Sequence, residues 1–230
     1  DFGLALLTEK SPAQGQTARE WTALKASATG ANFVGVSGLT VSANAISLEI
    51  TRKAADQTLV DYKAQNLAVQ TGTSATPSTL TLDMAANLGE ITRASGNLTI
   101  DAFGFLQVSG AMALNRTTAN VTLGDLASTT PLNEAATPVS VDQLTIGGSG
   151  LSAFAGINGG SNDPTGLNLT GVDFGLALLT EKSPAQGQTA REWTALKASA
   201  TGANFVGVSG LTVSANAISL EITRKAADQT

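Results

Sequence analysis

Acidic side chains are the groups in this chain with the clearest potential for chemistry, because the sequence contains no histidine and no cysteine. The first absence removes the usual base at neutral pH, and the second removes thiol nucleophiles and disulfides. A pair of carboxylates could still serve a polysaccharide lyase or hydrolase. The candidates are each isolated in a polar context: Asp61, Asp83, Glu90, Asp101 and Asp125. We therefore predict solvated surface carboxylates, no catalytic residues and no enzyme.

Two glycine-rich strings raise the question of calcium. GGSGLS begins at Gly147 and GGSND at Gly159, and both are similar to the nonapeptide that binds calcium in β-rolls. The first string has Ser152 where that motif needs an aspartate, and in the second no apolar residue follows Asp163. We predict turns, no metal site and no cofactor; if calcium binds, Asn162 and Asp163 are the first candidates.

Threonine and the few aromatic residues are the remaining candidates for binding. Apolar-Thr-apolar strings with spacings of 41, 18, 23 and 23 residues are too uneven for an ice-binding ladder and indicate outward-facing strand positions instead; they are centred on Thr40, Thr81, Thr99, Thr122 and Thr145. A second function is a glycan-binding module that uses Asn, Thr and aromatic side chains, with Trp21 and Tyr62 among them.

Composition favours a folded chain built from strands. Hydrophobic residues make up 42% of the sequence and aromatic residues only 4%, so Leu, Val, Ile and Ala must form the core. The net charge of −5 argues against nucleic acid or an anionic membrane as a partner. No apolar run reaches the length of a membrane span, so we expect no membrane insertion.

An exact internal repeat is the strongest signal in the sequence. Residues 1–58 recur without change as residues 173–230, so the period is 172 residues. We divide the chain into one complete repeat, residues 1–172, and the start of the next, residues 173–230. Such repetition favours a structural or adhesive polymer over an enzyme, and it predicts that the sequence from Leu59 onward would follow Thr230.

A weaker threefold pattern lies inside the period. Its units are anchored near Leu39, Leu98 and Leu167, and with the next anchor at Leu211 the spacings are 59, 69 and 44 residues. Each unit contains short apolar strings separated by small polar or glycine residues.

The alternation of apolar residues changes phase within these units. Apolar residues occupy odd positions from Leu39 to Ala43 and even positions from Ile46, and a similar change occurs at Gly171. A strand can change phase only at a bend or a bulge. We interpret the change as a corner between two faces, and aligned corners predict an all-β, elongated β-solenoid of the parallel β-helix type.

Two alternatives remain open. An antiparallel β-sandwich or prism array would also accommodate many short strands, although Asn158-Gly159 is the only Asn-Gly pair available for a tight hairpin. The segment that starts at Trp21 could be another strand, or a helical turn for which Thr17 and Glu20 have capping-box spacing.

The strings VSGLTVSANAISLEI, which ends at Ile50, and GLNLTGVDFGLALLTEK, which ends at Lys182, resemble the long repeats of giant bacterial surface and secreted proteins of the haemagglutinin-like or adhesin type. The resemblance implies an elongated, exported, multi-repeat protein. We therefore predict a structural segment of a long extracellular or cell-surface stalk or fibre. Its expected partners are neighbouring repeats of the same chain, further copies bound end to end or laterally, and a cell-surface glycan or protein.

Overall fold

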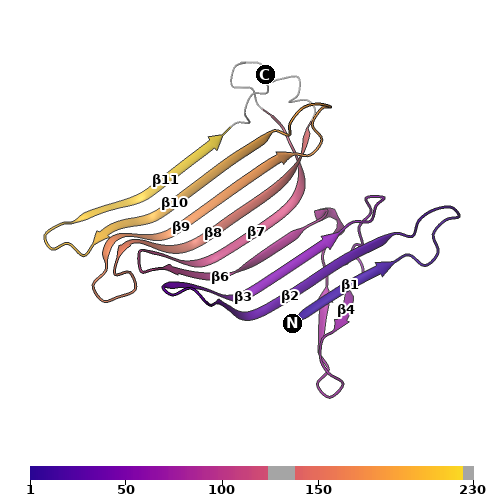
Figure 1. Ribbon diagram of the computed structural model, residues 1–230, viewed down its shortest axis with the longest axis horizontal. Helices are drawn as coiled ribbons and strands as arrows, with labels where there is room; N and C mark the ends of the chain where they lie inside the picture. Colours follow the sequence, from indigo (N-terminus) through magenta and orange to yellow (C-terminus); the bar gives the residue numbers. More distant parts are fainter. Residues whose placement is uncertain (124–137, 225–230) are drawn as a thin grey trace.

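The computed structural model describes residues 1–123 and 138–224, and in these ranges the chain is all-β. One sheet contains nine strands in the order β1-β2-β3-β6-β7-β8-β9-β10-β11, and a second sheet contains β4 and β5 (Figure 1). The strands of the large sheet are β1 (Phe2–Thr8), β2 (Glu20–Phe33), β3 (Leu39–Arg52), β6 (Thr92–Ala102), β7 (Leu106–Val121), β8 (Val139–Ile157), β9 (Thr165–Glu181), β10 (Glu192–Val206) and β11 (Val213–Arg224).

Every neighbouring pair in the large sheet is antiparallel, so the prediction of a parallel β-solenoid is wrong. Leu39 in β3 and Leu98 in β6 lie on adjacent strands that run in opposite directions, which stacked coils would not allow. The antiparallel alternative has the correct relative direction of neighbouring strands. The described residues nevertheless form one open sheet with a small second sheet, rather than a sandwich or prism.

The reversal between β6 and β7 shows why the scarcity of Asn-Gly misled the prediction. Phe103 and Gly104 both have positive φ angles, of 57° and 69°, and the Phe105 N–H donates to the Ala102 carbonyl oxygen at 3.0 Å. Two successive positive φ angles are typical of the tight turn for which Asn-Gly is the usual sequence. Phe-Gly makes the same reversal here.

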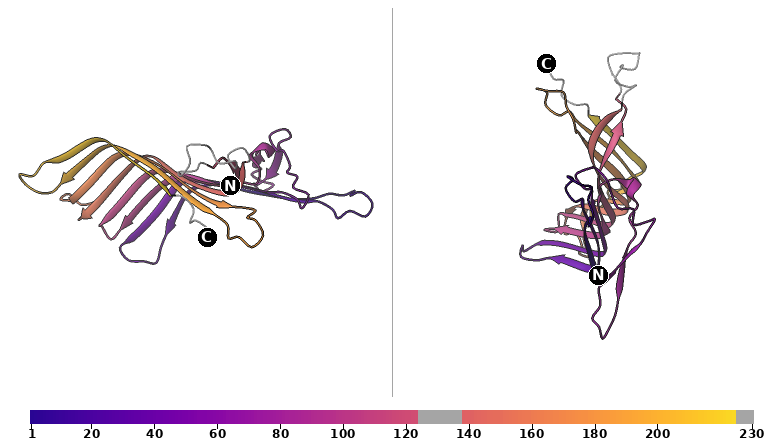
Figure 2. Two further views of the ribbon diagram at one scale, coloured as in Figure 1. Left: turned by 90° about the horizontal axis from the view of Figure 1, so that it is seen from above. Right: turned by 90° about the vertical axis from the view of Figure 1, so that its right-hand side faces the viewer.

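The predicted change of phase is a β-bulge. Between Asn44 and Ser47, β3 contains one more residue than the facing part of β6, and Ala45 has a φ of 51°. A bulge of one residue shifts the alternation by one position, so the apolar residues on both sides of it point to the same face. The bend was predicted correctly, but the corner between two faces was wrong. Figure 2 shows the resulting bent and twisted sheet.

The segment from Trp21 to Ala28 lies in β2, and its copy lies in β10. The strand alternative is therefore correct for this segment. Trp21 and its neighbours pair with β1 and β3, and these backbone hydrogen bonds replace those that a helical turn would make.

One face of the sheet, which we call the apolar face, carries continuous rows of apolar side chains. Residues paired across neighbouring strands share a face, so their partners can be followed from strand to strand. One row crosses all nine strands through Phe2, Ala26, Leu48, Ala94, Leu114, Ile146, Leu176, Leu196 and Ile222. Much of this face is open: Phe2 is 58% exposed and Leu6 is 70% exposed.

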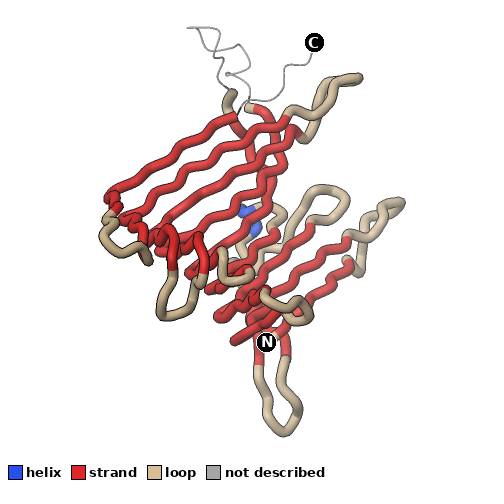
Figure 3. Tube along the Cα trace, turned by 60° about the vertical axis from the view of Figure 1, so that its left-hand side comes forward, coloured by secondary structure: helices blue, strands red, loops and turns tan. Residues whose placement is uncertain are grey.

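The opposite face, which we call the cap face, is partly covered by residues 59–91, which we call the cap. The cap contains β4 (Leu67–Gln70), β5 (Thr79–Leu82) and a 3-10 turn, η1 (Ala86–Leu88), which is the blue segment in Figure 3. Its side chains pack on small residues of β1 and β2 in a cluster of Ala5, Ala23, Tyr62, Leu82, Met84 and Ile91.

The two copies of the repeated segment form the same three-stranded unit. Leu4 pairs with Leu24 in the first copy, and Leu176 pairs with Leu196 in the second, a shift of one period. The first copy lies beside β6 and the second beside β8, within the same sheet.

The sheet is also staggered. The row of paired residues that contains Ala26 in β2 contains Leu196 in β10. The residue that corresponds to Ala26 in the second copy, however, is Ala198. Each period therefore displaces the pairing by two residues along the strands.

Candidate functional site

The two outer edges of the sheet are the first surfaces on which the repeat could act. The free edge of β11 has the sequence of the β3 edge that pairs with β6, from Val41 opposite Ile100 to Ile50 opposite Thr92. The free edge of β1 has the sequence of the part of β9 that pairs with β8, where Phe174 faces Gly148. Among the described residues, no strand pairs with either outer edge.

These edges are different from each other, which determines how the sheet could grow. The β11 edge matches a strand of the β6 sequence, and the β1 edge matches a strand of the β8 sequence. A heterologous contact of this kind extends in one direction instead of closing into a symmetric pair. Exposed edges also offer backbone donors and acceptors to any additional strand.

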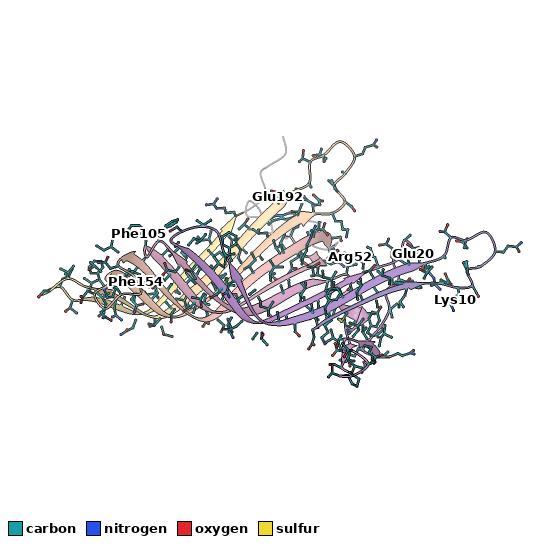
Figure 4. All side chains as sticks on the ribbon, turned by 60° about the horizontal axis from the view of Figure 1, so that its bottom comes forward. Lys10, Glu20, Arg52, Phe105, Phe154 and Glu192 are labelled. Carbon is teal, nitrogen blue, oxygen red and sulfur yellow. The ribbon has the colours of Figure 1, made fainter. Side chains whose placement is uncertain are left out.

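An arginine clamp closes the long hairpin of each copy. Arg19 donates from Nε to Glu9 Oε2 at 3.0 Å and from a terminal nitrogen to Oε1 at 2.8 Å. Arg191 makes the same two hydrogen bonds with Glu181, both at 2.9 Å. The guanidinium carbon of Arg19 also lies 5.2 Å from the centre of the Trp21 ring. Figure 4 shows Lys10 on the projecting hairpin beyond Glu20.

Hydrogen bonds in this clamp change the acidity of its members. The side-chain hydrogen bond from Arg19 lowers the pKa of Glu9, and the bond from Arg191 lowers the pKa of Glu181 in the same way. The pairing keeps both carboxylates charged and orients the loops.

The four predicted carboxylate candidates that the structure describes make separate contacts. Asp83 pairs with Lys25 at 2.6 Å, and Glu90 pairs with Lys53 at 3.6 Å. Each of these contacts holds the cap or its connection to the sheet.

The other two described candidates stabilise local backbone. Asp61 accepts from the backbone N–H groups of Lys63, Ala64 and Ala86 within the cap, and Asp101 accepts from Gly104 and Gln107 at the β6–β7 turn. Asp125 lies outside the described residues.

The proposed calcium residues lie in the exposed loop between β8 and β9. The backbone N–H of Asp163 donates to the Ser161 hydroxyl oxygen at 3.2 Å, which is a turn contact. Within residues 1–123 and 138–224, no group of three or more His, Cys, Asp or Glu side chains is arranged to hold a metal ion.

The threonine candidates are dispersed. Thr40, Thr99 and Thr145 lie on β3, β6 and β8 without facing one another, whereas Thr81 lies in β5 and Thr122 follows β7.

The two aromatic candidates for glycan binding lie in different surroundings. Tyr62 is only 3% exposed and lies in the cluster through which the cap packs on the sheet. The Trp21 indole N–H donates to the Thr58 carbonyl oxygen at 3.1 Å. The Tyr62 ring is therefore closed to a ligand, whereas the Trp21 ring is partly exposed and only its N–H is engaged within the chain.

Sequence reasoning missed the small residues that seat the cap. A Cβ on Gly3 would lie 3.1 Å from Leu80 Cδ2, and Ala23 is fully buried. The alternation of Gly3, Ala5 and the larger Leu7 was the available signal, because a packed layer needs small residues where another backbone comes close.

Comparison with protein-family models, with curated proteins and with solved structures finds no match to this chain. None of the described helical residues forms a helix long and apolar enough to cross a membrane.

Proposed function

We propose that this chain is a segment of a structural stalk or fibre in which each 172-residue period adds six strands to one continuous antiparallel sheet. The observation that carries the proposal is the equal placement of the two identical segments. The first copy supplies β1, β2 and β3, and the second supplies the end of β9, β10 and β11, with the same residue pairing.

Growth of the sheet would be driven by burial of backbone edges and by lateral contact between apolar rows. An added strand of the β6 sequence would satisfy the open donors and acceptors of β11, as Thr92–Ala102 does for β3. The interactions lie between neighbours in the sheet, so stability would be distributed along the array, as in other repeat proteins.

The setting that we propose for this fibre is extracellular or cell-surface, of the adhesin type. The exact repeat, the acidic cysteine-free composition and the resemblance to bacterial surface repeats support it. Its partners would be neighbouring repeats, further copies of the chain, and a cell-surface glycan or protein bound by other parts of the fibre.

Chains with one, two and three complete periods would test the proposal. Six strands spaced at about 4.8 Å predict that each added period lengthens the particle by roughly 29 Å across the strands. Small-angle scattering and electron microscopy would measure this increment. A particle that stays compact and nearly spherical as periods are added would contradict the proposed function.

A further inference from the structure

The two copies of the repeated segment differ in what covers the cap face. In the first copy the cap lies over Gly3, Ala5 and Ala23, and Ala5 is 7% exposed. In the second copy the identical positions line a shallow cavity of about 430 Å³, with Gly175, Ala177 and Ala195 in its wall. Ala195 is exposed, although its counterpart Ala23 is fully buried.

The glycine near the start of each copy shows the same difference in packing in atomic detail. A Cβ placed on Gly3 would lie 3.1 Å from Leu80 Cδ2 and 3.4 Å from Val69 Cβ, both in the cap. A Cβ placed on Gly175 would meet nothing within 4 Å. The same sequence is thus closely packed in one copy and open in the other.

Charge at the margin of the cavity follows the same pattern. Lys25 pairs with Asp83 of the cap at 2.6 Å, and it also lies 3.8 Å from Glu49. Lys197 occupies the position of Lys25 in the second copy and is exposed, with no ion pair to any described residue. A carboxylate placed as Asp83 is placed would neutralise it.

We propose that this cavity is the seat of a second cap with the sequence of residues 59–91, joined after Thr230 as Leu59 is joined to Thr58. We call the cavity the second seat. Three features point to this occupant. The two sheet surfaces have the same sequence, the second seat offers the small residues on which the apolar side chains of a cap pack, and Lys197 has no ion pair to any described residue. The inference rests on the proposed function, because a continuing array would deliver this segment to the second seat.

The absence of cysteine from the chain allows a direct test with single thiols. A23C and A195C place a thiol at the same position of β2 and β10, under the cap and in the second seat respectively. In the 230-residue chain, we expect a maleimide reagent to modify A195C roughly 100-fold faster than A23C, because labelling of A23C requires local opening. In a chain extended by residues 59–91, A195C should slow to the rate of A23C.

Gly175→Val supplies the matched control in the extended chain. In the 230-residue chain, the Cβ of the valine has free space. In the extended chain, the valine would collide with the leucine equivalent to Leu80 when a cap occupies the second seat. We expect it to restore rapid labelling of A195C while A23C stays slow.

The outcomes separate the alternatives. Rapid labelling of A195C in the extended chain, with A23C still slow, would show that the second seat is not occupied by a cap. Protection of A195C that persists with Gly175→Val would show that something other than a seated cap covers it, and rapid labelling of A23C would show that the cap does not protect this face at all. Each of these results overturns the inference, whereas the length increment per period tests the proposed function separately.

Discussion

Lys25 Nζ lies 2.6 Å from Asp83 Oδ1, and this ion pair connects the nine-stranded sheet to the cap. The aspartate side chain is half exposed, so water screens the pair and its contribution to stability is modest. The pair still identifies the copy that carries a cap, because its counterpart Lys197 faces open space.

Replacement of this lysine should affect only the first copy. We expect Lys25→Ala to lower the free energy of unfolding by up to about 1 kcal/mol, and Lys197→Ala to change it by less than about 0.5 kcal/mol. Urea unfolding followed by Trp21 fluorescence, in a chain that carries Trp193→Phe, would measure the difference. Equal effects of the two substitutions would show that the cap does not use this contact.

Tyr62 should tolerate loss of its hydroxyl but not of its ring. The hydroxyl is buried and has no hydrogen-bond partner among the described residues. Tyr62→Phe should therefore be neutral or raise the free energy of unfolding by up to about 1 kcal/mol, because it removes a buried unpaired group. Tyr62→Ala should lower it by about 3 kcal/mol or more, because it leaves a cavity under the cap. A loss with Tyr62→Phe as large as that with Tyr62→Ala would contradict the burial of this hydroxyl.

Burial also predicts a dependence on alkaline pH. It raises the pKa of Tyr62, so the folded state holds its phenolic proton to higher pH than the unfolded state. The contribution to stability is complete below the ordinary tyrosine pKa of about 10 and is lost as the pH rises through the folded-state value. Tyr62 is the only tyrosine, so absorbance at 295 nm reports its ionisation alone. The alkaline loss of stability should be smaller in Tyr62→Phe.

The arginine clamps predict a dependence on acid pH. Hydrogen bonds from Arg19 and Arg191 lower the pKa of Glu9 and Glu181. Their stabilisation is present above the ordinary glutamate pKa of about 4.3 and is lost as the pH falls through the lower folded-state values. Unfolding between pH 6 and pH 3 should therefore show a shallower decline in a chain with Glu9→Gln and Glu181→Gln. Identical pH profiles would mean that the clamps do not persist in solution.

Gly171 lies at a second bulge, between the pairs Leu151–Val172 and Ala153–Leu169 of β8 and β9, and should resist substitution more than a strand glycine. Gly171 has a φ of 58°, and a Cβ there would lie 2.4 Å from Thr201 Oγ1. We expect Gly171→Ala to lower the free energy of unfolding by about 1 to 3 kcal/mol, because alanine is strained at positive φ. Gly175→Ala is the control, since its Cβ meets nothing within 4 Å. Thermal unfolding would compare the two variants. Equal melting temperatures would show that the sheet does not bend at Gly171.

The sequence predicted the local features of the fold better than its topology. The change of phase between Ala43 and Ile46 located the bulge at Ala45, because alternation is a local property. The strand direction was missed because Phe103-Gly104 turns the chain without the usual residues. The bulge also divides long strands into two apparent short ones, which favoured coils over hairpins.

The candidate sites were harder to predict because they depend on contacts distant in sequence. Tyr62 lies in a polar segment and was a candidate for glycan binding, but its side chain packs on the small residues Ala5 and Ala23 of the sheet. No pattern within residues 59–91 shows which surface they cover. The second seat is visible only because one sequence occurs in two surroundings.

The two-residue stagger gives a long array an oblique geometry. Two residues correspond to about 7 Å along the strands for every roughly 29 Å of growth across them. The long axis of a fibre would then lean by about 13° from the perpendicular to its strands. Its hairpins would form a staircase along each border, and micrographs would show slanted striations whose direction of slant distinguishes one face of the sheet from the other.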